Sequence, residues 1–212
     1  MAIMNSLKRI LDILNSQLYK ANQKYKSNRR AKITSKLKEK MKSDKKRWEK
    51  STELHDNWDE RTKILAKFIK PNSHVIEFGA GNKSLFRFLP PNCVYSSSDI
   101  VKRYPDTLVC DLNERINFNL AAFNTAIFSG VLEYVYSIDN VFEQLSGKIE
   151  NVVLSYACAD ISGANRLKQG WLSDYRKEDL EIIFKKYNYK VEDYREWNKQ
   201  SIYKLIKINE CR

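Results

Sequence analysis

The chain has 212 residues, of which 42% are hydrophobic, so it can bury one sizeable core. No apolar stretch approaches the roughly 20 residues that a membrane-crossing helix needs. Residues 1 to 18 lack the basic start, the uninterrupted apolar run and the cleavage site of a signal peptide. The four cysteines are widely spaced without a Cys-x-x-Cys pattern, which argues against a metal centre or a disulfide framework. We therefore expect a cytoplasmic protein, with peripheral membrane attachment left open.

The net charge of +12 is concentrated at the N-terminal end. Residues 1–50 contain sixteen Lys or Arg against four Asp or Glu, whereas the rest of the chain contains twenty-two of each. This asymmetry predicts two parts, a basic helical N-terminal extension over residues 1–50 and a neutral body over residues 51–212.

The extension has a helical pattern. Residues 3–18 carry one apolar stripe with three- and four-residue spacing, formed by Ile3, Leu7, Ile10, Leu11, Leu14 and Leu18. Residues 20–50 contain no Pro or Gly, which predicts a helix with an interruption near Ser27 and Asn28.

Three roles for this extension compete. It packs on the body or on a second subunit in a homo-oligomer, it docks on an anionic membrane surface or a membrane-bound partner enzyme, or it binds RNA phosphates. The lack of an aromatic-rich platform for stacking bases disfavours RNA.

The body begins with a predicted helix over residues 53–70, followed by a short strand that ends in a glycine bend. Val75, Ile76 and Phe78 are β-branched or aromatic, as a strand buried on both faces requires. Gly79 and Gly81 follow at once, and because they lack a Cβ, the chain can turn sharply and a ligand can lie against the backbone.

An acidic residue lies at an informative distance from this bend. Asp99 follows Gly79 by twenty positions and ends a second strand-like run, residues 93–98. A carboxylate at about that offset accepts hydrogen bonds from ribose hydroxyls in Rossmann-type βαβ units. The bend and the acid together predict a nucleoside cofactor.

The segment from Glu77 to Lys83 resembles the acid-x-Gly-x-Gly-x-Gly motif of class I S-adenosylmethionine-dependent methyltransferases, with Lys83 in place of the third glycine. Residues 110–113 look like that family's loop after the third strand, whose acid meets the adenine amino group. Residues 126–135 look like the fourth strand and its loop, with Tyr134 replacing a histidine. The match covers about residues 54–208.

The end of the chain fits the same family. Residues 174–187 have helical apolar spacing, and residues 189–194 and 201–208 alternate as strands. The short connection between these two strands implies an antiparallel pair. With the resemblance, this predicts an α/β, Rossmann-like doubly wound sheet, mostly parallel with an antiparallel C-terminal strand.

The resemblance implies S-adenosylmethionine as the cofactor. The absence of an Asp/His cluster with ligand spacing argues against a metal-dependent, catechol-type enzyme. Arg61 suits the methionine carboxylate. The residues implied for cofactor binding are Trp58, Arg61, Glu77, Gly79, Ala80, Gly81, Asp99, Ile100, Asp111, Leu112, Ser129, Gly130 and Val131.

Methyl transfer is an in-line displacement, so the protein mainly aligns the reactants and removes a proton where needed. The candidates for this chemistry lie after the fourth and fifth strands and are Glu133, Tyr134 and Asp160, with Asp160 as the preferred base for a hydroxyl acceptor. Residues 162–175 read as a flexible, aromatic-bearing acceptor loop. The predicted acceptor contacts are Tyr156, Asn165, Arg166, Trp171 and Tyr175.

The sequence therefore predicts methyl transfer, most consistent with O-methylation, to a small or glycan-linked acceptor such as a sugar or sugar phosphate. The general resemblance is to small bacterial methyltransferases of surface-polysaccharide pathways. The alternatives are an RNA methyltransferase that uses the extension to grip phosphates, and a non-catalytic subunit that binds the cofactor. A nicotinamide-binding Rossmann domain is the nearest competing fold, with Ser84 serving as the small residue at the helix start.

Overall fold

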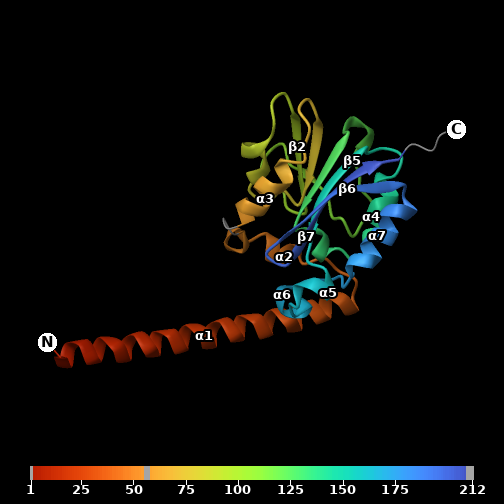
Figure 1. Cartoon of the computed structure of the whole chain (residues 1–212). Helices are drawn as coiled ribbons and strands as arrows, with labels where there is room; N and C mark the ends of the chain where they lie inside the picture. Colours follow the sequence, from red (N-terminus) through yellow and green to blue (C-terminus); the bar gives the residue numbers. More distant parts are fainter. Residues whose placement is uncertain (1, 55–57, 209–212) are drawn as a thin grey trace.

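The computed structural model describes residues 2–54 and 58–208, and its body is built on a seven-stranded sheet (Figure 1). The spatial order is β3-β2-β1-β4-β5-β7-β6. The strands from β1 to β5 pair in parallel, and β7 runs antiparallel to both β5 and β6. This confirms the predicted sheet. Strand bounds are β1 His74–Phe78, β2 Val94–Asp99, β3 Leu108–Val109, β4 Thr125–Ser129, β5 Asn151–Tyr156, β6 Tyr189–Trp197 and β7 Gln200–Lys207.

The strand order reverses between β1 and β4. The chain moves outward from β1 through β2 to β3 and then returns to the other side of β1 as β4. Open α/β sheets bind ligands outside the carboxyl ends of the strands at such a reversal, because the flanking connections diverge to opposite faces.

Helices cover both faces of the sheet, and alternate strand residues point into two separate cores. Ile76 and Phe78 belong to the core beneath α4 Ile138–Leu145 and α7 Lys177–Lys186, whereas Val75 belongs to the core beneath α3 Asp59–Ala66 and η3 Ser84–Phe88. These strand side chains are fully buried, as expected of parallel strands covered on both sides. The shorter elements are η4 Leu120–Ala122, η5 Leu132–Tyr134, α5 Ala159–Ser162 and α6 Arg166–Gln169.

The N-terminal extension is mostly one helix, α1 Ala2–Glu39, which projects from the body as a rod (Figure 1). The predicted interruption near Ser27 and Asn28 is wrong, because α1 runs through both residues, and the prediction of helix to residue 50 is also wrong. Met41 takes a left-handed conformation (φ 50°), and the Lys42 N–H bonds to the Leu37 carbonyl at 3.0 Å. A short helix, α2 Lys45–Trp48, comes next.

The helix predicted over residues 53–70 is shorter in the structure. It consists of η1 Ser51–Glu53 and α3, with residues 55–57 outside the described part. After α3 the Phe68 and Ile69 N–H groups bond three residues back, at 3.0 and 3.1 Å, as the chain approaches Pro71. The residue directly before a proline, here Lys70, is disfavoured in the helical conformation, so these last turns do not continue as helix to residue 70.

The predicted flexible loop over residues 162–175 contains α6 and the end of α5. Asn165 caps α6 by accepting the Lys168 N–H at 3.0 Å, and Gly170 ends it at φ 84°. The loop lies against the extension, where Arg47 Nη1 donates to the Gln169 carbonyl at 3.0 Å. Within residues 2–54 and 58–208, no helix combines the length and the apolar character of a bilayer span.

Candidate functional site

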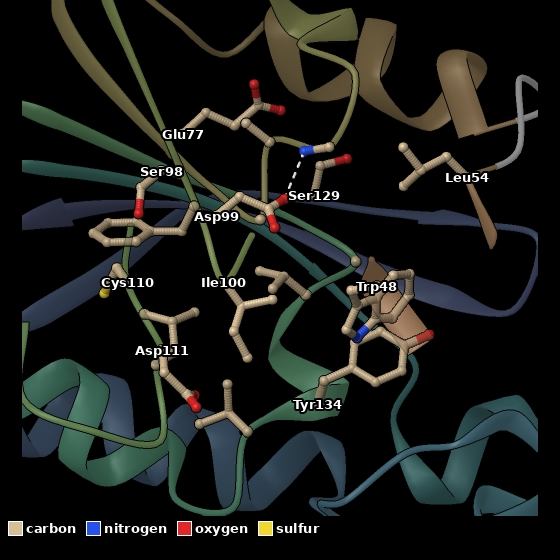
Figure 2. Close-up of a pocket in the computed structure, with 18 of the residues that line it drawn as sticks. Trp48, Leu54, Glu77, Ser98, Asp99, Ile100, Cys110, Asp111, Ser129 and Tyr134 are labelled. Carbon is tan, nitrogen blue, oxygen red and sulfur yellow. Dashed lines mark hydrogen bonds between the residues drawn. The ribbon is translucent and has the colours of Figure 1, made fainter. Parts of the chain in front are cut away.

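A cavity lies at the carboxyl ends of β1, β2 and β4, where the strand order reverses (Figure 2). Every residue that we predicted for cofactor binding lines it, and so does Tyr134. The lining residues that the prediction missed are Ser43, Asp44, Trp48, Leu54, Thr62, Phe78, Asn82, Ser84, Ser98, Cys110, Asn113 and Val135.

The glycine bend forms one wall of this cavity and is tied to the acid on the neighbouring strand. Gly79 and Gly81 have φ of 65° and 52°, and the Gly81 N–H donates to Asp99 Oδ2 at 2.9 Å (Figure 2). A Cβ at Gly79 would lie 2.5 Å from a methyl group of Val131, so both backbone geometry and space require glycine there. Asp99 is 6% exposed, and its other oxygen accepts the Val101 N–H at 2.9 Å.

Lys83, which replaces the third glycine of the motif, takes the conformation that glycine would favour. Its φ is 58°, and such left-handed geometry costs a side-chain-bearing residue roughly 1 to 2 kcal/mol. Its ammonium group donates to Asp106 at 2.6 Å and lies 4.5 Å from the centre of the Tyr104 ring. Lys83 does not line the cavity, so the substitution leaves the cavity-facing side of the bend open.

Arg61 supplies a buried cation to the cavity. It is 5% exposed, and its Nη2 donates to the Ser129 carbonyl and its Nη1 to the Gln200 side-chain oxygen, both at 3.1 Å. Burial lowers the pKa of Arg61, and the nearby negative charge of Glu133 opposes this effect. A Cβ at Gly130 would lie 2.3 Å from Arg61 Nη1, which explains glycine at that position. Because these acceptors are neutral oxygens, the guanidinium suits an anionic ligand group.

Glu77 is a second buried ionisable group in the lining. Burial raises its pKa to about 8, although the Tyr95 hydroxyl, which donates to Glu77 Oε2 at 2.5 Å, opposes the shift. The Asp99 charge raises the pKa further, and Arg61 lowers it. Glu77 therefore carries a proton over much of the neutral range, so it adds little negative charge beside a ligand.

The extension contributes a wall that the sequence did not reveal. Trp48 packs edge-on against Tyr134, with ring centres 4.8 Å apart (Figure 2). The Arg47 guanidinium lies 4.5 Å from the Trp48 ring centre and pairs with Glu53 at 2.9 Å. Arg103 also donates to the Trp48 carbonyl. A single tryptophan in an otherwise charged segment was the signal available in the sequence.

Ser43 joins the extension to the loop after β3. Its hydroxyl donates to Asp111 Oδ1 at 2.8 Å, and Asn113 Nδ2 donates to the Ser43 oxygen at 2.8 Å. Asn113 also donates to the Tyr134 carbonyl at 3.0 Å, so the two loops and the extension share one network.

Tyr134 lines the cavity, whereas the other two residues predicted for catalysis do not. Burial raises the pKa of the Tyr134 hydroxyl, and a hydrogen bond with Trp171 opposes this. Glu133 is 1% exposed, and its Oε1 accepts the Ala157 N–H at 2.9 Å. Asp160 lies outside the cavity and accepts the Lys177 N–H at the start of α7, at 3.1 Å.

The predicted acceptor contacts also lie outside the cavity lining and form a network beside it. Tyr156 is fully buried, and its hydroxyl accepts from Arg166 at 2.8 Å and from the Tyr175 N–H at 3.2 Å. The Arg166 guanidinium lies 4.5 Å from the Trp171 ring centre. Asn165 serves as the cap of α6. Trp171 nevertheless contacts the cavity lining, because its side chain is hydrogen-bonded to Tyr134.

No protein-family model matches the chain, and no curated protein matches its sequence. Solved structures do match its fold. A SAM-dependent methyltransferase from Aquifex aeolicus is 11% identical, with a TM-score of 0.52 over 69% of this chain and 89% of that one. A second, from Mesorhizobium loti, is 12% identical, with a TM-score of 0.53 over 68% and 96%.

The fold also occurs in a protein that is named for another activity. The [4+2]-cyclase SpnF is 13% identical, with a TM-score of 0.51 over 65% of this chain. The chain spans 58% of the length of that cyclase and 54% of a methyltransferase of calicheamicin biosynthesis. The likenesses establish a Rossmann-like methyltransferase fold, and a shared fold does not by itself fix the reaction.

Proposed function

We propose that this protein is an S-adenosylmethionine-dependent methyltransferase. The proposal is carried by one observation: the glycine bend, two acids and a buried arginine all line one cavity. The acids are Asp99 at the end of β2 and Asp111 just after β3, and the arginine is Arg61. These groups lie up to 50 residues apart in the sequence. Packing of the core does not require polar groups so far apart to meet in one cavity, whereas binding of a ligand does.

The donor set of the cavity fits the parts of this cofactor. Asp99 would accept hydrogen bonds from the ribose hydroxyls. Asp111 would accept a hydrogen bond from the adenine amino group, with the adenine between the apolar side chains of Ile100 and Leu112. Arg61 would bind the methionine carboxylate, because its guanidinium is buried and engages neutral oxygens. When bound, the sulfonium supplies an electrophilic methyl group.

The residues of this chain would align an acceptor rather than supply a strong base. The raised pKa of Tyr134 keeps its phenol protonated at neutral pH, so it donates or accepts a hydrogen bond at an acceptor hydroxyl. Trp48, Tyr134 and the polar side chains of Ser43 and Asp44 share this part of the lining. Aromatic faces beside polar groups suit a sugar-like or other small hydroxylated acceptor, which supports O-methylation of a small or glycan-linked molecule.

Calorimetric titration of the full chain with S-adenosylmethionine and S-adenosylhomocysteine tests the cofactor assignment. Asp99→Ala should weaken binding about 5- to 150-fold, because one to three kcal/mol of charge-assisted hydrogen bonding is lost. Asp106→Ala is the matched control, since this exposed acid pairs with Lys83 outside the cavity. Circular dichroism checks that both variants fold. Equal affinity of the Asp99 variant and the wild type would contradict the assignment.

The reaction is tested by release of S-adenosylhomocysteine with separate pools of sugars, sugar phosphates, glycolipid precursors and RNA. The exposed Lys and Arg side chains of α1 favour one second candidate, an RNA methyltransferase. Turnover only on RNA, with affinity that falls steeply with salt and is lost without residues 1–38, would favour it. Tight cofactor binding with no turnover on any pool would instead favour a non-catalytic subunit.

A further inference from the structure

The projecting part of α1 carries an exposed apolar stripe. Leu14, Leu18 and Tyr25 recur at helical spacing on one face and are 49%, 69% and 67% exposed. The sequence continues the same spacing toward the N-terminal end with Ile3, Leu7, Ile10 and Leu11. From residue 3 to residue 25 the helix rises about 33 Å. The body leaves Leu14, Leu18 and Tyr25 uncovered.

This stripe faces away from the body. Ser27 is half-buried and Thr34 is buried, and they follow Leu18 and Tyr25 by nine residues, or about two and a half helical turns. They therefore lie on the opposite face, and Thr34 is 1% exposed. A flat surface can contact the whole stripe while the body stays on the other side of the helix, as the projection of α1 in Figure 1 also allows.

Beyond Tyr25 the same face becomes basic. Arg29, Lys32 and Lys36 continue the spacing of the stripe, and all three are exposed. Residues 2–39 contain ten Lys or Arg and two Asp or Glu, a net charge of +8. A second copy of α1 would bring two such helices together against their mutual repulsion, whereas an anionic surface would be attracted.

We propose that α1 is an interfacial helix that docks the protein on an anionic lipid bilayer. The helix lies in the plane of the surface with its stripe below the headgroups, and Arg29, Lys32 and Lys36 contact the headgroup phosphates. Tyr25 lies between the apolar and basic stretches, at a depth where tyrosine is favoured. This proposal does not depend on the cofactor or on the reaction.

Vesicle sedimentation with the full chain tests the proposal. The probes are phosphatidylcholine vesicles with and without phosphatidylglycerol. The stripe variant is Leu14→Asn with Leu18→Asn. The matched control is Ile13→Asn with Tyr19→Asn. These side chains are 57% and 66% exposed, but each lies about 100° around the helix from the stripe residue next to it, Leu14 or Leu18. All four side chains are exposed, so neither variant disturbs a core.

Wild type should bind vesicles with phosphatidylglycerol, with an affinity that falls as salt rises, and should bind the neutral vesicles weakly. The stripe variant should lose about tenfold or more in partitioning, and the control less than about twofold. Equal losses in the two variants, or equal binding to both vesicle types, would overturn the proposal. The proposal would also be overturned if the wild type does not bind vesicles but forms a dimer, measured by light scattering, that the stripe variant does not form.

Discussion

Glu77→Gln should remove a pH dependence from the stability of the folded protein. Glu77 is 3% exposed, and its burial raises the pKa of the carboxyl from 4.5 to about 8. Glutamine keeps an oxygen that can accept a hydrogen bond from the Tyr95 hydroxyl, but it does not ionise. The substitution therefore isolates the titration of this one group from its packing.

The magnitude comes from the two pKa values. Below pH 4.5 the carboxyl is protonated in both the folded and the unfolded chain, so it adds no pH dependence. Between 4.5 and about 8 the folded protein keeps a proton that the unfolded chain has released. Each pH unit in this window lowers the free energy of unfolding by about 1.4 kcal/mol. Across the window the loss reaches about 5 kcal/mol, a large part of the stability of a typical domain.

Urea unfolding followed by circular dichroism, repeated from pH 4.5 to pH 8, measures this effect. The Glu77→Gln variant should gain stability over the wild type progressively as the pH rises. Glu143→Gln, on the exposed face of α4, is the control and should behave like the wild type throughout. A constant difference between Glu77→Gln and wild type at every pH would refute the reasoning, because burial would then not have shifted the titration.

Two further substitutions test the bend and the extension. Gly79→Ala should cost about 2 to 5 kcal/mol of unfolding free energy, since its Cβ would lie 2.5 Å from Val131. Gly147→Ala, with φ 75° and no neighbour within 4 Å, should cost only about 1 to 2 kcal/mol of strain, and equal losses in urea unfolding would contradict the steric argument. Trp48→Ala should weaken the apparent affinity for the acceptor (KM) about tenfold in the turnover assay, because Trp48 lies beside Tyr134 in the part of the cavity that we assign to the acceptor. Trp197→Ala, on β6, should leave that affinity unchanged, and so would Trp48→Ala if the extension does not shape the site.

Local patterns predicted the sheet and the residues that line the part of the cavity that we assign to the cofactor. The alternation of Val75, Ile76 and Phe78 indicated a buried strand, and the two cores on opposite faces account for it. Gly79 and Asp99 were connected by the fixed length of a βαβ unit, and the structure ties the bend to this acid through the Gly81 N–H. Such features depend on neighbours within about twenty residues.

The part of the cavity that we assign to the acceptor was not predictable in the same way. Asp160 and Tyr156 have the residue types of a polar site, but the first caps α7 and the second is buried in a hydrogen-bonded network. Conversely, Trp48 was assigned to a basic arm separate from the body, although it lines the cavity. Residue type alone does not distinguish a side chain that faces a ligand from one that faces its own protein.

The sequence by itself determined the strands, the bend that only glycine can form, and the alternation of apolar and basic residues along α1. Only the tertiary structure decided where α1 ends and which way the chain turns after it. The Tyr136 hydroxyl lies 2.8 Å from the Leu37 carbonyl oxygen and 2.9 Å from that of Lys42, across more than 90 positions of sequence. That contact and the left-handed Met41 turn the chain so that Ser43 and Trp48 reach the cavity. No local propensity encodes such a turn, because its hydrogen-bonding partner exists only once the sheet has folded.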